Sequence, residues 1–138
     1  PCVPTSQGTG TVYEQHRRFF GEEDRDPREA LLDDLKDAIK EWQAAGDIIV
    51  LGMDANEDTR SRELRTYFDE LGMKNAILER HKHLSPPATH NRNQCREPID
   101  GIWISKCLDV IAAGFLAVGD GCPSDHVALW IDLRKQDV

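Results

Sequence analysis

Three groups of polar residues stand where apolar, strand-like runs begin or end, and their residue types suit hydrolytic chemistry. They are Asp54 with Asn56, Asp100 alone, and the consecutive Ser124, Asp125 and His126. An Asp-x-Asn sequence after a strand is also typical of a turn or a helix cap, so that pair alone indicates little. Asp100 is harder to dismiss. It interrupts the apolar run 99–103, and a buried carboxylate is costly without a cation or a hydrogen-bond donor.

His126 is the candidate partner for Asp100. One ring nitrogen of a histidine can donate to a carboxylate while the other exchanges a proton, as in the acid and base pairs of many hydrolases. Asp125 adds a hard oxygen ligand of the kind that Mg²⁺ binds. Asp54 and Asn56 are two residues apart, so in an extended segment their side chains lie on one side, where they can orient a water and hold a phosphoryl oxygen. Together these residues predict a site for metal-assisted hydrolysis.

Helices and strands must position these side chains. Helical spacing of apolar residues predicts a short helix within 13–20, a long helix from the cap Asp26 to Gly46, and a third helix from Thr59 or Ser61 to Gly72. The continuous apolar run 47–53 predicts a central strand covered on both faces. Further strands are predicted at 99–105, 108–118 and 127–133, after a long polar loop at 81–97.

This order of elements predicts the fold class α/β, or more closely α+β, with one sheet that carries helices on one face and needs a partner on the other. The chain has 138 residues, of which 39% are apolar and 30% charged, so we expect one domain over 1–138. No apolar run approaches the length of a membrane span. The net charge of −8 argues against nucleic-acid binding by bulk electrostatics, so phosphate chemistry here would need a cation.

The four cysteines are Cys2, Cys95, Cys107 and Cys122, and they form no CxxC pair. Their spacing does not predict a structural zinc site. Reduced thiols are the simpler interpretation, and they are typical of an intracellular protein, nuclear or cytoplasmic.

Four short motifs also match a known pattern. The sequences LGMDAN (51–56), PATH (87–90), PIDGIWIS (98–105) and PSDH (123–126) resemble, in order and rough spacing, motifs of the endonuclease/exonuclease/phosphatase superfamily with the DNase I-like fold. The wording is most similar to retroelement-type endonuclease domains. The resemblance covers the whole chain but only the C-terminal half of the family's domain. It therefore implies one half of a four-layer α/β sandwich.

The resemblance also implies roles for single residues. Asp54 would position or deprotonate the attacking water, and Asn56 would contact the scissile phosphate. Asp100 would orient the catalytic His126, which would stabilise the phosphate or act as an acid and base. These four are the predicted catalytic residues.

Two further roles follow from the same resemblance. Asp125 would be an acidic ligand of Mg²⁺, with Mn²⁺ as the other candidate ion, and Thr89 would join Asn56 in binding substrate. The family's principal metal-binding Glu belongs to the first half of its domain, and we find no counterpart in this sequence. Losing a carboxylate from an oxygen-ligand Mg²⁺ site weakens it, because such sites rely on one or two carboxylates.

These expectations lead to one function and two alternatives. The chain is expected to be part of a Mg²⁺-dependent phosphodiesterase, a nucleic-acid endonuclease acting on DNA in preference to RNA. The first alternative is a non-catalytic fragment or interaction module that keeps the fold. The second is a phosphoesterase that acts on a small phosphoester or a lipid, which an acidic chain would tolerate better. Because one face of the sheet is expected to be uncovered, we also expect a homodimer or association with an N-terminal half.

Overall fold

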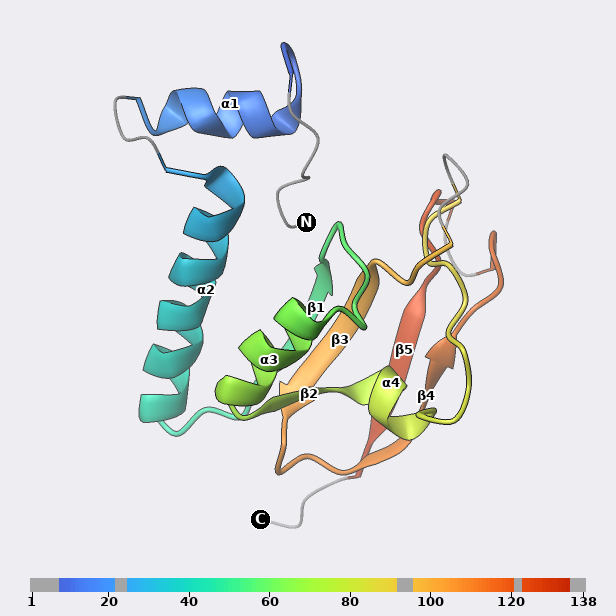
Figure 1. The fold of residues 1–138 in the computed structure, drawn as a ribbon. Coiled ribbons are helices and arrows are strands. Elements are labelled where there is room, and N and C mark those ends of the chain that lie inside the picture. The colour runs from blue at the N-terminus through green and yellow to red at the C-terminus, as the bar shows by residue number, and fades with distance from the viewer. Residues whose placement is uncertain (1–7, 22–24, 92–95, 121–122, 135–138) are drawn as a thin grey trace.

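The structure is a computed structural model that describes residues 8–21, 25–91, 96–120 and 123–134. It is a mixed α+β fold with antiparallel sheets (Figure 1). In chain order the elements are α1 (Val12–Phe19), α2 (Pro27–Ala44), β1 (Val50–Asp54), α3 (Arg62–Glu70), β2 (Met73–Asn75), α4 (Ala76–Arg80), β3 (Asp100–Ser105), β4 (Val110–Phe115) and β5 (Leu129–Leu133). The sequence did not predict β2 and α4, which are three and five residues long. None of the described helices is long and apolar enough to cross a membrane.

Local signals account for the two longer helices. The carboxylate of Asp26 accepts hydrogen bonds from the backbone N–H groups of Arg28 and Glu29, which makes Asp26 the N-cap of α2, as predicted. The chain leaves α2 through Gly46, whose φ of +89° few other residues adopt. Ser61, one of the two predicted candidates, caps α3 by accepting from the N–H of Leu64.

The first sheet has the strand order β1-β3-β2, and both pairs are antiparallel. The central strand is β3. The prediction that the run 47–53 forms a central strand is wrong, because β1 pairs on one side only among the described residues. Ile48 and Val50 remain 52% and 51% exposed. A continuous apolar run indicates that both faces of a strand are suited to burial. It does not show that other segments of the same chain pack against both faces.

One face of this sheet packs against α2 and α3, as expected. Trp103 of β3 stacks on Phe68 of α3 with ring centroids 4.5 Å apart, and Ile39 of α2 joins the same buried cluster. Gly101 makes room for this packing, since an added Cβ would lie 2.6 Å from the Trp103 ring. The larger hydrophobic core therefore lies between the helices α2 and α3 and the strands β1 and β3.

The other face is partly covered by a second sheet, made of the antiparallel pair β4 and β5. Ile104 and Leu108 form a buried cluster there, with Ile131 and Leu133 of β5 packed against it. Figure 1 shows β3 between α3 on one side and β5 on the other. The expectation of a single sheet with one bare face is thus corrected. The predicted strands divide into two sheets, because β5 packs against the face of β3 instead of extending its sheet.

Candidate functional site

The end of β1 and the start of β3 bring two predicted site residues together. In the antiparallel register Asp54 lies directly opposite Asp100. Residues in such a pair project from the same face of the sheet with their Cβ atoms about 5 Å apart. Two carboxylates this close repel each other unless a cation or a proton donor lies between them. The sheet itself therefore creates a place for positive charge.

His126 supplies the donor for this pair. Its Nδ1 lies 2.9 Å from Oδ2 of Asp100, which confirms the predicted contact between the strand carboxylate and the imidazole. Asp54, Asp100 and His126 each place one ligand atom within 4.8 Å of the other two. We call these three residues the carboxylate cluster. All three are only partly buried, so solvent and small ions can reach them.

The surroundings of His126 change its protonation. Burial is the largest single influence, and it lowers the pKa of the imidazole. The hydrogen bond with Asp100 and the negative charges of Asp100, Asp54 and Asp125 act in the opposite direction, and together they raise the pKa of His126 above its ordinary value. The imidazolium is therefore more populated near neutral pH than in an isolated histidine. Such a group can donate a proton or hold an anionic oxygen.

Asn56 reaches Asp54 by a different geometry from the one predicted. It lies outside β1 in a turn and has a φ of +51°, a left-handed conformation that asparagine tolerates. Oδ1 of Asp54 accepts from the backbone N–H of Asn56 at 2.8 Å, and Nδ2 of Asn56 lies 3.4 Å from Oδ2 of Asp54. The two side chains are adjacent because a tight turn folds one back on the other, not because they share a face of a strand.

Arg28 of α2 supports this turn, and sequence reasoning missed it. Its guanidinium donates to the carbonyl of Ala55 at 2.8 Å and to Oε2 of Glu57 at 2.6 Å, and Ser61 donates to the other oxygen of Glu57. The Arg28 side chain is only 12% exposed. No short-range signal could have found these contacts, because Arg28 and Ala55 are 27 residues apart in the chain.

Thr89 connects the polar loop to β3. Its side chain is fully buried, and its Oγ1 accepts from the backbone N–H groups of Ile99 at 2.9 Å and Asp100 at 3.0 Å. The hydroxyl thereby positions the backbone of Asp100. The structure gives Thr89 a positioning contact, and the substrate contact that the resemblance implies remains a prediction.

A second group of residues also includes His126. Nε2 of His90 is 3.4 Å from Oδ2 of Asp125, and the His90 and His126 rings have centroids 4.6 Å apart. His90, Asp125 and His126 again place one ligand atom each within 4.8 Å of the others. We call these three residues the histidine cluster. Asp125, the predicted metal ligand, belongs to this cluster, and among the described residues it forms no such group with Asp54 and Asp100.

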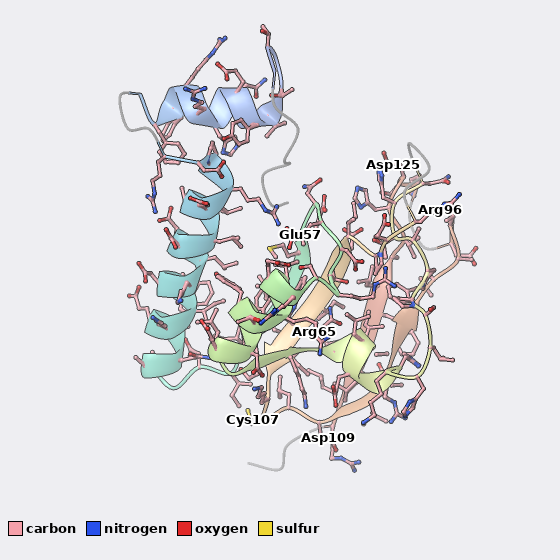
Figure 2. All side chains as sticks on the ribbon, viewed as in Figure 1. Glu57, Arg65, Arg96, Cys107, Asp109 and Asp125 are labelled. Atoms are coloured by element: carbon pink, nitrogen blue, oxygen red, sulfur yellow. The ribbon has the colours of Figure 1, made fainter. Side chains whose placement is uncertain are left out.

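His90 had no predicted role, although it is the last residue of the motif PATH. The only signal in the sequence was its position next to Thr89. Figure 2 shows Asp125 and Glu57 toward the same end of the molecule, and Cys107 and Asp109 at the opposite end. Cys107 is a free, exposed thiol, and the other three cysteines lie outside the described residues.

Comparison with known proteins identified no relative of this chain. No family model matches the chain, and neither the curated proteins nor the solved structures include a match. The family resemblance therefore rests on the four motifs alone.

Proposed function

We propose that this chain carries part of the active site of a metal-dependent phosphodiesterase, and that the enzyme is a nucleic-acid endonuclease. The observation that carries the proposal is the 2.9 Å contact between Asp100 and His126, made beside Asp54. An oriented histidine with a raised pKa, next to two carboxylates, has the groups that hydrolysis of a phosphodiester needs. The DNase I-like sandwich belongs to the same proposal, and the antiparallel sheets with helices on one face are consistent with it.

The donor set fits a hard divalent ion. Asp54 and Asp100 offer carboxylate oxygens at close range, which Mg²⁺ or Mn²⁺ prefers, whereas Asp125 groups with His90 and His126 instead. When bound, such an ion would stabilise the negative charge that develops on the phosphate and make a bound water more acidic. Losing this ion should therefore abolish hydrolysis while the fold persists.

The protein residues divide the remaining work. Asp54 would orient the attacking water and accept its proton, and the Nδ2 amide of Asn56 would donate to a phosphoryl oxygen. Asp100 holds Nδ1 of His126, so that the other nitrogen faces the reaction and can give a proton to the leaving oxygen. Arg28 and Thr89 would be positioning residues, since they hold the turn and the strand that carry these groups.

A group of basic side chains is the observation that favours a polyanionic substrate. A cavity of about 800 Å³ lies between α3, β2, α4 and the following loop. Five basic residues line it, namely Arg60, Arg62, Arg65, Lys74 and Lys82, against the acidic Asp69 and Glu79. Figure 2 shows Arg65 in the space between α3 and α4. In a chain with a net charge of −8, this local excess of positive charge favours nucleic acid over a small phosphoester. The preference for DNA over RNA rests on the family resemblance alone.

The direct test is nicking of supercoiled plasmid with Mg²⁺, by this chain alone and then mixed with the N-terminal half of a retroelement-type endonuclease. We expect nicking that chelation abolishes and that His126→Ala lowers by about a hundredfold or more. His83→Ala, which changes an exposed histidine outside both clusters, is the control. Absence of nicking in both mixtures would favour the interaction module, and hydrolysis of bis-p-nitrophenyl phosphate without nicking would favour a small phosphoester.

The charged cavity has its own test. Changing both Arg62 and Arg65 to Gln should weaken DNA binding equally for unrelated sequences, and should reduce the slope of log affinity against log salt by about 2. Arg17→Gln in α1 is the control, because Arg17 lies outside this cavity. An unchanged salt slope would remove the cavity from the binding surface.

We also propose that a second copy of the chain, or a supplied N-terminal half, covers β1. Ile48 and Val50 are about half exposed beside the strand edge that pairs with nothing among the described residues. An exposed apolar edge of this kind is a pairing surface. Sedimentation over a range of concentrations checks the homodimer, and a monomer at every concentration would leave the N-terminal half as the partner to test.

A further inference from the structure

We infer that the histidine cluster of His90, Asp125 and His126 is a binding site for a transition-metal ion of the Zn²⁺ class, distinct from the hard-ion position at Asp54 and Asp100. The inference rests on the geometry of the cluster and does not depend on whether the chain hydrolyses phosphodiesters.

The donor atoms separate the two positions chemically. The histidine cluster offers two imidazole nitrogens and one carboxylate oxygen. Imidazole suits Zn²⁺, Cu²⁺ and Ni²⁺, whereas Mg²⁺ is held almost entirely by oxygen. Three protein ligands of the type two His and one carboxylate, with one position left for water, are a known arrangement of open zinc sites. The cluster should therefore prefer Zn²⁺ over Mg²⁺.

The distance between His90 and Asp125 agrees with this arrangement. In a tetrahedral zinc site, with bonds of about 2.0–2.2 Å, neighbouring ligand atoms are about 3.3–3.5 Å apart. Nε2 of His90 and Oδ2 of Asp125 are 3.4 Å apart, which is longer than most N–H···O hydrogen bonds and close to that edge length. The side chains of His90, Asp125 and His126 are 21%, 37% and 32% exposed, so an ion can enter and keep a water.

Asp100 prepares His126 for metal binding. A histidine that binds a metal through one nitrogen usually donates its other N–H to a carboxylate, which fixes the tautomer and the ring orientation. Nδ1 of His126 already lies 2.9 Å from Oδ2 of Asp100. With the proton on Nδ1, the lone pair lies on Nε2, so an ion bound there would occupy the nitrogen that the hydrolytic proposal uses for proton transfer, and Zn²⁺ should inhibit hydrolysis.

The backbone holds the two ligand-bearing segments in register before any ion binds. His90 and His126 form an antiparallel β-bridge, flanked by hydrogen bonds from Val127 N–H to the Thr89 carbonyl and from Asn91 N–H to the Asp125 carbonyl, each 2.8 Å long. The buried Thr89 hydroxyl then joins this bridge to β3. Side chains supported in this way need little ordering when an ion arrives.

A surface ion pair between His90 and Asp125 is the competing interpretation, and calorimetric titration with Zn²⁺ distinguishes the two. We expect one site in the full chain, an affinity that falls by about tenfold or more in His90→Ala and Asp125→Asn, and no displacement by excess Mg²⁺. His83→Ala should bind like the parent, because His83 is an exposed histidine of the same loop outside the cluster. Equal binding by His90→Ala, or no binding by the parent chain, would overturn the inference.

Cobalt replaces zinc in a second measurement that identifies the ligands. Visible absorption of the Co²⁺ complex at tetrahedral intensity, without thiolate charge-transfer bands, is the expected result, and it should disappear in His90→Ala. Thiolate bands would mean that cysteines hold the ion and would also overturn the inference. Far-ultraviolet circular dichroism confirms that each variant is folded. The metal titrations contain no nucleic acid, so they are independent of the nicking assay. Absence of nicking would not contradict the Zn²⁺ site, and absence of Zn²⁺ binding would not contradict the hydrolytic proposal.

Discussion

The carboxylate cluster and the histidine cluster share His126 but are built in different ways. Regular antiparallel pairing of β1 and β3 places Asp54 opposite Asp100. A single β-bridge and the buried Thr89 place His90 beside His126. His126 belongs to both clusters: its Nδ1 contacts Asp100, and its ring lies beside that of His90. In this chain, strand register alone brings the two carboxylates together. The two histidines and Asp125 come together only because the loop that carries His90 is held both by the β-bridge and by Thr89.

The largest expected effect separates the clusters by function. Asp54→Asn removes a carboxylate from one cluster only, so nicking should fall by about a hundredfold or more, while Zn²⁺ affinity should change by less than about twofold. His126→Ala should lower both, because His126 belongs to both clusters. Plasmid nicking and calorimetry measure the two effects. If Asp54→Asn weakens Zn²⁺ binding as much as His126→Ala does, the clusters are one site.

A change at Thr89 should disturb both clusters together. Thr89→Val leaves the N–H groups of Ile99 and Asp100 without their acceptor, at a cost of about 1–3 kcal/mol in the free energy of unfolding. Thr59→Val is a matched control, since Oγ1 of Thr59 is buried without a hydrogen-bond partner among the described residues. That change should be neutral or stabilising. Urea denaturation measures both, and an equal loss for the two variants would contradict the role given to the Thr89 hydroxyl.

Removing Arg28 should affect the carboxylate cluster alone. Arg28→Met removes the donor to the Ala55 carbonyl and to Oε2 of Glu57, and we expect a loss of about 1–2 kcal/mol in the free energy of unfolding with Zn²⁺ affinity preserved. Arg25→Met breaks a much more exposed ion pair with Asp33, which should be worth less than about 1 kcal/mol. Denaturation and calorimetry on both variants check this. A loss for Arg28→Met no greater than for Arg25→Met would show that the turn does not depend on α2.

The smallest effect is expected at acidic pH, at the start of α2. Tyr13 donates a hydrogen bond to Asp26, and this contact, with the N–H groups of Glu29 and Arg28, lowers the pKa of Asp26 despite its partial burial. A lowered folded-state pKa means that the stabilisation is present above the unfolded-state pKa and is lost as the pH falls through the folded-state pKa.

Asp26→Asn tests this dependence, because asparagine caps a helix about as well but does not titrate. The stability difference between the parent and the variant should therefore shrink as the pH is lowered, and because solvent screens this carboxylate the change should stay below about 1 kcal/mol. Urea denaturation at a series of pH values measures it. If the difference in the free energy of unfolding stays constant with pH, the charge of Asp26 does not stabilise the start of α2.

Local features were the most predictable from the sequence. The caps Asp26 and Ser61 and the turn at Gly46 depend on neighbouring residues, so the two longer helices follow from short-range signals. The contact between Asp100 and His126 was also predictable. A carboxylate in an apolar strand needs a hydrogen-bond donor, and His126 is a donor at the start of another predicted strand. The edge position of β1 was not predictable, since residue pattern does not reveal which strands become neighbours.

The sequence by itself determined most of the residues that could do chemistry and the positions of the longer helices and strands, because residue type, spacing and capping act over a few positions. Only the tertiary structure decided that Asp54 lies opposite Asp100, that Arg28 holds the turn after β1, and that His90 stands beside His126. These contacts join segments far apart in the chain, and they depend on strand register and helix docking. Those are properties of the whole packed core, which no single stretch of the sequence encodes.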